Sequence, residues 1–380
     1  MIAVLLALVL MPAWGYLLAT VFAAARFARQ AGASRAPTVP VSVLKPLHGA
    51  EPGLYQNLRS FAEQDYPPRE MQIVLGVRSS NDAALPAARA LIRDFPGLEI
   101  ALVIDSRAIG SNLKIANLEN MLPAAKHDIL VLADSDMRVG RHYLAAVTGP
   151  LAAPGAGVVT CLYKGVPTGG LWSELGAMHI NFGFLPSALV GEALGMGGGC
   201  FGATIALRRE VLSRIGGFAR FRDELADDHR IGAAVRDLGL ATVLSPYLVE
   251  NRVTEPSFAG LWRHELRWAR TVRAMAPFGF AGSVVTHGVV IAALAAAGSG
   301  MGLTSCAILV LSCLLRWASA GAVARLLGLP TAGLWLLPAR DALSFAVFLG
   351  SFCGRSVRWR GQSFRVQPGG RMTLDGDKAA

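Results

Sequence analysis

The stretch VLADSDMRVG, residues 131–140, runs from apolar residues directly into an Asp-Ser-Asp triplet. Its start belongs to DILVLAD (128–134), whose composition predicts a buried strand. Side chains two positions apart in a strand point to one face, so Asp134 and Asp136 are expected to share a face. Two such carboxylates repel each other unless a cation lies between them. The stretch therefore predicts a site for a divalent cation shared with phosphate groups or, since Asp-Ser-Asp also suits turns, a solvated turn.

The chain before this stretch alternates between two periodicities. Strands are expected at 41–46, 71–77, 99–105 and 128–134, and helices between them at 53–64, 82–95 and 112–125. This strand–helix rhythm predicts an α/β fold with a mostly parallel sheet. Ligands of such sheets bind outside the carboxyl ends of the strands, which is where the Asp-Ser-Asp triplet lies.

The composition indicates that part of the chain lies in lipid. Of its 380 residues, 53% are hydrophobic, and the mean hydropathy is +0.44. The formal charge is +10, but the arginines gather beside apolar segments and form no basic, aromatic-rich surface stretch, which argues against nucleic acid as a partner. The five cysteines follow no zinc or disulfide spacing, and this fits a reducing compartment.

The first 25 residues are almost wholly apolar and end before Arg26. They are long enough to span a bilayer and lack the basic start of a cleaved signal peptide. We therefore expect a transmembrane signal-anchor helix over 1–25, followed by a linker over 26–40. Because basic residues stay on the cytoplasmic side, the N-terminus is expected outside and the linker inside.

A second apolar region covers residues 282–353, with crossings expected near 283–299, 302–320 and 333–353. Arg340 and Asp341 interrupt the last of these, which also fits a re-entrant hairpin. Three full crossings would leave the basic tail, 354–380, outside, whereas the charge rule keeps it inside. The number of C-terminal crossings is therefore left open at two to four.

The polar region between these apolar parts, 41–257, is expected to form one α/β domain. A strand is expected at 157–163, and a helix carrying the acidic pair Asp227-Asp228 at 223–238. The apolar, glycine-interrupted segment 171–195 fits either a groove or a membrane surface. An amphipathic helix over 258–275, within an interface segment 258–281, spaces its arginines as partners for phosphate oxygens.

Two further motifs bear on ligand binding. Asp82, in RSSNDAA after the second expected strand, is placed to hold a nucleotide ribose or base. GGGCFG (197–202) matches G-x-G-x-x-G by count, but a strand, ATIAL, follows it where a dinucleotide fingerprint needs a helix. Its glycines are instead expected to let the backbone approach a ligand.

In this order, the motifs resemble those of family 2/21 glycosyltransferases, within them the ceramide glucosyltransferase group. Members carry three spaced aspartates and a Q/R-x-x-R-W motif, which correspond here to Asp82, Asp134 with Asp136, Asp228, and His264-Glu265-Leu266-Arg267-Trp268. KPLHGAEPGLYQNLRSFAEQDYP, GSNLKIANL, RREVLSRIGGF and WRG (359–361) resemble further blocks of the group. His264 departs from the usual Gln or Arg. Bacterial hopanoid-biosynthesis glycosyltransferases look most similar.

The resemblance implies a GT-A fold and an inverting transfer from a UDP-sugar that uses Mg²⁺ or Mn²⁺. It implies that Asp82 holds the uridine, that Asp134 and Asp136 hold the metal, and that Asp134 also contacts the nucleotide. Asp228 is the implied general base, although a carboxylate at a helix start also answers the helix dipole. The remaining contacts to the nucleotide sugar or acceptor fall to Lys114, His264, Arg267 and Trp268, the last of which equally fits packing.

The implied acceptor is a membrane lipid hydroxyl. A hopanoid polyol with UDP-GlcNAc is favoured, and ceramide with UDP-glucose is the alternative. A processive polysaccharide synthase is a further alternative, which would need more crossings than the sequence offers. The implied location is the bacterial inner membrane, with the catalytic domain facing the cytosol.

Overall fold

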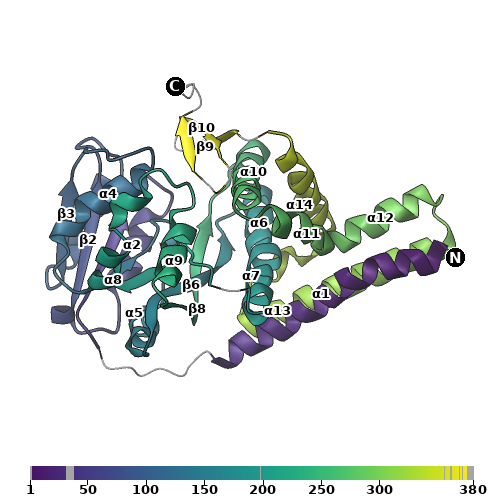
Figure 1. The fold of residues 1–380 in the computed structure, drawn as a ribbon, viewed down its shortest axis with the longest axis horizontal. Helices are drawn as coiled ribbons and strands as arrows, with labels where there is room; N and C mark the ends of the chain where they lie inside the picture. Colours follow the sequence, from purple (N-terminus) through teal and green to yellow (C-terminus); the bar gives the residue numbers. More distant parts are fainter. Residues whose placement is uncertain are drawn as a thin grey trace. The chain divides into compact units, whose positions relative to one another are not determined.

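The computed structural model describes residues 2–30, 38–196, 198–354, 356–359, 362–367, 369 and 371–374. The chain forms two compact units (Figure 1). The α/β unit comprises residues 31–164 and 198–252, and the helical unit comprises 1–30, 165–197 and 253–380. Residues 165–197 therefore belong to the helical unit although they lie inside the expected domain 41–257.

One sheet organises the α/β unit, with the strand order β3-β2-β1-β4-β7-β6-β8-β5 among the described residues. Strands β1 to β4 pair in parallel, and β7 then pairs antiparallel with both β4 and β6. The expected parallel sheet is thus correct for the first half and wrong for the second. The strands are Val41–Pro46 (β1), Met71–Val77 (β2), Glu99–Ile104 (β3), Ile129–Leu132 (β4), Met137–Arg138 (β5), Ala156–Pro167 (β6), Ile205–Arg208 (β7) and Ala241–Val253 (β8).

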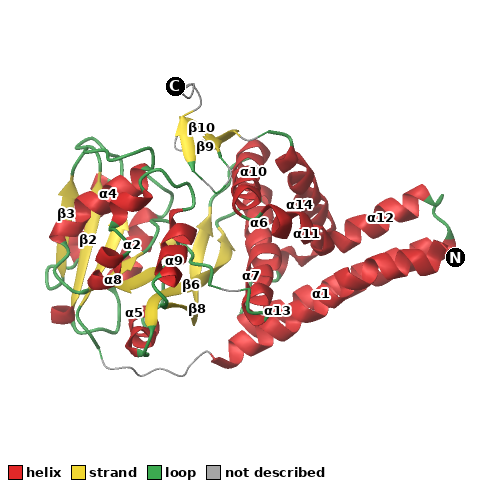
Figure 2. Cartoon of the chain, viewed as in Figure 1, coloured by secondary structure: helices red, strands yellow, loops and turns green. Residues whose placement is uncertain are grey.

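Helices cover both faces of this sheet (Figure 2). Alternate strand residues point to opposite faces: Val43 and Ile73 pack with one set of helices, whereas Leu44 and Val74 pack with the other. Burial on both faces explains the continuous apolar runs of the expected parallel strands. The first set is Leu54–Ala62 (α2), Leu85–Asp94 (α3) and Tyr143–Thr148 (α5); the second is Leu113–Met121 (α4), Arg209–Arg214 (α8) and Asp227–Asp237 (α9).

The helical unit contains the apolar helices. α10 coincides with the amphipathic helix expected over 258–275, whereas the segment expected to end at 25 continues as α1 to Gln30; residues 31–37 of the expected linker lie outside the described residues. The helices are Ile2–Gln30 (α1), Leu171–His179 (α6), Leu185–Ala193 (α7), Phe258–Met275 (α10), Pro277–Gly282 (α11), Gly288–Gly298 (α12), Leu303–Leu327 (α13) and Leu337–Phe352 (α14). A small sheet follows, formed by Ser356–Trp359 (β9), Gln362–Val366 (β10) and Met372–Leu374 (β11).

Four helical stretches in the described part of the chain are long and apolar enough to cross a membrane: Leu8–Gln30, Pro277–Gly298, Leu303–Leu327 and Ala332–Phe352. The segment 171–195, for which the sequence left two readings open, forms α6 and α7, joined by a π-helical turn. It is not among the candidate spans.

Candidate active site

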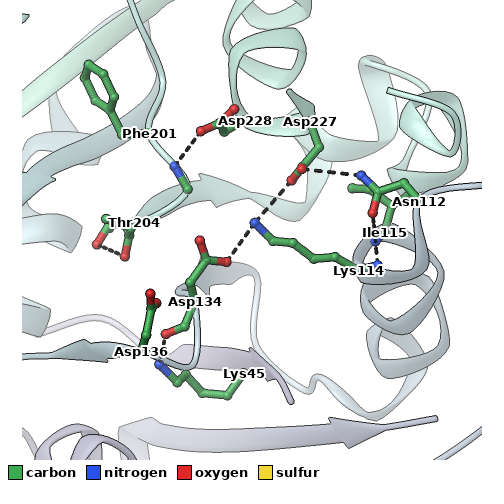
Figure 3. A network of polar contacts seen from close by, with 12 residues as sticks. Lys45, Asn112, Lys114, Ile115, Asp134, Asp136, Phe201, Thr204, Asp227 and Asp228 are labelled. Atoms are coloured by element: carbon green, nitrogen blue, oxygen red, sulfur yellow. Dashed lines mark hydrogen bonds and ion pairs between the residues drawn. The ribbon is translucent and has the colours of Figure 1, made fainter. Parts of the chain in front are cut away.

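The Asp-Ser-Asp triplet lies in the loop between β4 and β5 (Figure 3). The sequence placed Asp134 in the strand, and this is wrong: β4 ends at Leu132, and the Met137 amide donates to the Asp134 carbonyl, so the chain turns here. The two carboxylates are therefore positioned by a turn and its partners rather than by strand alternation. Asn251 on β8 holds Asp136, because its Nδ2 lies 2.8 Å from Asp136 Oδ2.

A buried lysine supports this turn through a hydrogen bond. Lys45 lies near the end of β1, donates from Nζ to the Asp134 carbonyl, and places Nζ 3.9 Å from the centre of the Phe61 ring. Burial lowers the pKa of Lys45 to about 7, against the opposing pull of Asp134, Asp136 and Glu51. Sequence analysis missed this residue, although a lysine in the apolar strand VSVLKP was the available signal.

The pKa of Asp136 is raised to about 6 by burial and then by the negative charges of Asp134 and Glu51. The hydrogen bond from Asn251 and the charge of Lys45 oppose this rise but do not cancel it. Ionisation of this carboxyl is thus less favourable than in water, and a cation beside it would offset that cost.

Lys114 joins the triplet to the acidic pair on α9. The side chain of Asn112 begins α4 by accepting from the amides of Lys114 and Ile115. The Lys114 ammonium then lies 2.7 Å from Asp134 Oδ1 and 3.3 Å from Asp227 Oδ2 (Figure 3). Burial alone would lower the pKa of Lys114, but Asp134, Asp227 and Asp228 together hold it above its usual range. This lysine remains charged and bridges two carboxylates.

Asp228, in the first turn of α9, points its carboxylate toward the glycine-rich loop (Figure 3). Its Oδ2 accepts from the Gly202 amide at 2.8 Å, and its Oδ1 accepts from the His229 amide at 2.7 Å. Burial and the neighbouring Asp227 raise the pKa of Asp228 to about 6, while Lys114 opposes the shift. A carboxyl with this pKa is ionised at pH 7 yet basic enough to accept a proton in a reaction.

Gly202 brings the two acidic groups together. A Cβ at this position would lie 2.9 Å from Asp134 Oδ2, 3.3 Å from Lys114 Nζ and 3.4 Å from Asp228 Oδ2. Only a glycine therefore fits between these side chains without displacing them. The glycine-rich loop was expected to bring backbone close to a ligand; in the structure, it brings backbone close to the carboxylates.

The donor set at this site fits Mg²⁺ or Mn²⁺. Asp134 and Asp136 offer hard oxygen ligands, and burial together with the negative charges of Asp134 and Glu51 raises the pKa of Asp136. Within the described ranges, no group of three or more His, Cys, Asp and Glu residues is placed to hold a metal without other ligands. Such an ion would complete its coordination with phosphate oxygens and water, as Mg²⁺ usually does.

Asp82 links the loops that follow β1 and β2. Its Oδ1 accepts from the amides of Gly49 and Ala84, each at 2.9 Å, and its Oδ2 lies 3.7 Å from His48 Nδ1. Both loops leave the carboxyl ends of parallel strands, the same edge of the sheet that carries the Asp-Ser-Asp triplet. Asp82 thus shapes this edge through backbone contacts.

The remaining expected site residues, His264, Arg267 and Trp268, lie on α10 of the helical unit. His264 Nδ1 is 2.6 Å from Glu255 Oε1, and its ring meets the Trp268 ring edge-on with the centroids 4.5 Å apart. The next residue in this motif, Glu265, forms a buried ion pair with Arg340 on α14. Sequence analysis missed this pair, although Arg340 stood out as a charge in an apolar segment.

Comparison with known proteins identifies a family model that spans nearly the whole chain and curated relatives that match parts of it. The family model described as "Glycosyl transferase family 21" matches residues 5–372. "Ceramide glucosyltransferase 1" of Caenorhabditis elegans is 24% identical over 243 residues, 63% of this chain and 52% of that protein. "Ceramide glucosyltransferase" of Komagataella phaffii is 35% identical over 103 residues, 26% of this chain and 20% of that protein. The chain thus spans about half the length or less of these two curated relatives.

Among solved structures, a mannosyltransferase from Pyrobaculum calidifontis, in complex with GDP-Man and Mn²⁺, matches with a TM-score of 0.52. It is 20% identical, and the match covers 92% of this chain and 98% of that one. This likeness and the family match confirm the expected GT-A fold, and the described residues add four candidate membrane helices to it.

Proposed function

Because the chain belongs to glycosyl transferase family 21, we propose that it transfers a sugar from a UDP-sugar to a membrane lipid hydroxyl. One observation carries the proposal. Asp134 and Asp228 both approach the position of a Gly202 Cβ, at 2.9 and 3.4 Å, so a metal ligand and a candidate base adjoin one small volume. A metal–diphosphate site beside a base is what a direct sugar transfer requires.

In the proposed reaction, Asp228 removes the proton of the lipid hydroxyl while that oxygen attacks the anomeric carbon of the sugar. The new carbon–oxygen bond forms as the bond to the diphosphate oxygen breaks, so the configuration inverts and UDP leaves with the bonding electron pair. Asp228 later releases its proton to water. Asp134 and Asp136 would hold a divalent ion, which when bound would supply a Lewis acid for the charge on the departing diphosphate.

Other polar groups of the chain position the candidate base and the proposed metal ligands. Lys114 fixes Asp134 against Asp227 and adds positive charge near the proposed diphosphate site. Asp82 is proposed to serve the uridine through the two loops that it holds. By their likeness to the Q/R-x-x-R-W motif, we assign Arg267 to the diphosphate, Trp268 to sugar or acceptor, and His264 to the acceptor groove.

We propose a hopanoid polyol as the acceptor and UDP-GlcNAc as the donor, from the resemblance of the motifs. Ceramide and UDP-glucose form the second candidate pair, which is favoured by the names of the relatives. In either case, the four candidate membrane helices support a lipid acceptor. The basic residues after the first helix favour a catalytic unit on the cytosolic side of a bacterial inner membrane.

The test is direct. The purified full chain is incubated with lipid extract in separate reactions, each containing one donor: UDP-glucose, UDP-GlcNAc, UDP-galactose or GDP-mannose. The lipids are then analysed by mass spectrometry. We expect one hexosyl or N-acetylhexosaminyl lipid from a UDP-sugar, lost with EDTA and restored by Mn²⁺ or Mg²⁺. Glycolipid formed only from GDP-mannose would contradict the donor assignment. Glycolipid formed equally in EDTA would contradict the metal assignment. The Asp228→Asn variant serves as the background control.

A further inference from the structure

The long helices of the helical unit define two membrane faces. α1 and α13 lie side by side (Figure 1), and their contacts advance together: Trp14 bonds to Ser312, and Thr20 bonds to Ser319. The two helices are therefore parallel. We name the face that α1 and α13 reach at their C-terminal ends the Gln30 face, and the face at their N-terminal ends the Leu303 face.

α12 returns in the opposite direction. Its first residue, Gly288, packs against Ala13 of α1, and a short loop then joins its end at Gly298 to Leu303 of α13. The stretch Pro277–Gly298 thus runs from the Gln30 face to the Leu303 face. In its described part, the chain between Gln30 and Pro277 holds no candidate span, so α10, which ends at Met275, lies on the Gln30 face.

The end of α14 is bonded to α10. Arg270 donates to the carbonyls of Cys353 and Ser356, the latter at 2.6 Å, and Arg273 donates to the Gly354 carbonyl at 2.8 Å. Cys353, Gly354 and Ser356, which follow α14, therefore lie beside the last two turns of α10, a helix on the Gln30 face. A helix that had crossed the bilayer would end at the Leu303 face instead.

The start of α14 lies on the same side. α13 ends at Leu327, on the Gln30 face, and only residues 328–331 precede the turn Ala332–Leu336 that leads into α14. The Trp317 indole of α13 donates to the Leu334 carbonyl at 2.9 Å, which holds this turn against the second half of α13. Both ends of α14 thus belong to the Gln30 face.

The charges of α14 are satisfied by its protein neighbours. Arg340, only 1% exposed, pairs with both carboxylate oxygens of Glu265 at 2.7 Å. Asp341 accepts from Arg316 of α13 at 2.9 Å. The helix has 16 residues, so it is about 24 Å long and shorter than the roughly 30 Å of a hydrocarbon core.

The opposite surface of this region is apolar and exposed. Trp335, Leu349 and Phe352 of the Ala332–Phe352 stretch are 73%, 51% and 48% exposed, and Phe278, which begins the neighbouring span, is 92% exposed. This surface continues that of the candidate spans, and exposed tryptophan suits the headgroup level of a bilayer. The partner that matches it is lipid.

We propose that α14 is embedded in the leaflet at the Gln30 face and does not cross the bilayer. The described part of the chain then crosses three times, with α1, the stretch Pro277–Gly298 and α13, and its described residues between Gly354 and Leu374 remain on the face reached by Gln30. This arrangement places the basic tail where the charge rule requires it, although the Ala332–Phe352 stretch alone has the length and composition of a crossing.

The test uses single cysteines in the otherwise cysteine-free full chain. Native Cys353, which is exposed, reports the end of α14. Met301→Cys, in the exposed loop before α13, reports the Leu303 face, and Arg141→Cys, exposed in the α/β unit, reports the Gln30 face. Sealed vesicles of one orientation are treated with a membrane-impermeant maleimide before and after permeabilisation.

We expect Cys353 to label under the same conditions as Arg141→Cys and under the opposite conditions to Met301→Cys. Labelling of Cys353 together with Met301→Cys would show that α14 crosses and would overturn the proposal. A protease site appended after Ala380, with all native cysteines kept, gives a second reading that does not depend on removing thiols. Cleavage from the face of Met301 alone would equally refute it.

Discussion

Both units bury charged side chains, but they balance them differently. In the α/β unit, two lysines, Lys45 and Lys114, face five carboxylates: Glu51, Asp134, Asp136, Asp227 and Asp228. In the helical unit, Arg340 is matched by Glu265, and Arg316 is matched by Asp341. The first cluster carries excess negative charge, and the second set is paired one to one.

This difference distinguishes a candidate active site in the α/β unit from ion pairs that attach helices to one another in the helical unit. Burial, and then the neighbouring negative charges, raise the pKa values of Asp136 and Asp228 to about 6, so each can accept a proton or a cation. Matched pairs hold two elements together and offer nothing to a ligand, since their charges are already satisfied. The buried charges of the α/β unit are therefore proposed to serve catalysis, whereas those of the helical unit attach α14 to α10 and α13.

Removing the candidate base should have the largest effect on activity. Asp228→Asn keeps the size of the side chain and an acceptor for the Gly202 amide, but it cannot take a proton. We expect kcat to fall by about 10²- to 10⁴-fold, the usual contribution of a general base. Steady-state transfer from UDP-sugar to lipid measures this, with donor binding followed separately by calorimetry.

The matched control is Asp237→Asn, which changes an exposed aspartate at the other end of α9. It should leave kcat within about twofold of the parent, because surface substitutions have small effects. Equal activity of the Asp228→Asn enzyme and the parent would show that Asp228 is not the general base. The functional contrast between the charge clusters of the two units would then no longer hold.

In the helical unit, the largest effect should be on stability. Arg340→Met leaves Glu265 buried without its partner, and a broken buried pair costs about 3–5 kcal/mol. The double variant Arg340→Met/Glu265→Met removes both charges and should recover most of that loss. Thermal unfolding in detergent, at fixed detergent and protein concentration, measures the two unfolding free energies.

Arg325→Met, on the exposed side of the last turn of α13, controls for the loss of an arginine from this unit. Its unfolding free energy should stay within about 0.5 kcal/mol of the parent value. Equal destabilisation in the single and double variants would show that Arg340 and Glu265 are not coupled, and the pair would not attach α14 to α10.

Sequence patterns predicted the elements whose apolar residues repeat regularly along the chain. β1, β2 and α10 occur at the expected residues because apolar periodicity is a local property. A turn at Asp-Ser-Asp was one of two interpretations, but the sequence placed Asp134 in the strand. The roles of Lys45 and Gly202 were not predicted, since each depends on contacts between residues far apart in the chain. The antiparallel half of the sheet was missed for the same reason.

The raised pKa of Asp228 also predicts a pH dependence. At saturating metal, kcat/KM should fall about tenfold per unit below pH 6, where this carboxyl, with a pKa of about 6, becomes protonated. A carboxyl whose pKa is raised on folding binds its proton more tightly when folded. Its contribution to the unfolding free energy therefore rises as the pH falls from 6 toward 4.

Acid should thus inactivate the enzyme at Asp228 while the contribution of this group to the unfolding free energy increases. Activity profiles between pH 5 and 8, with circular dichroism at each pH, check both statements. A midpoint near pH 4, the ordinary range of aspartate, would mean that neither burial nor Asp227 affects the base, and the excess charge would have no functional consequence.

The smallest effect should come from Gly202→Ala, which adds no charge and removes none. The new methyl group would lie 2.9 Å from Asp134 Oδ2 and 3.3 Å from Lys114 Nζ, so these side chains must move by a few tenths of an ångström. We expect kcat to fall by roughly two- to tenfold, because larger misplacements of about 1 Å cost up to about a hundredfold. Gly97→Ala, where nothing lies within 4 Å of the added carbon, is the matched control. If both variants retain full activity, the close approach of Gly202 is not needed for catalysis, and the carboxylates do not depend on a fixed spacing. A loss of activity in the Gly202 variant alone would show that the cluster around Asp134 and Asp228 depends on its geometry as well as on its charge.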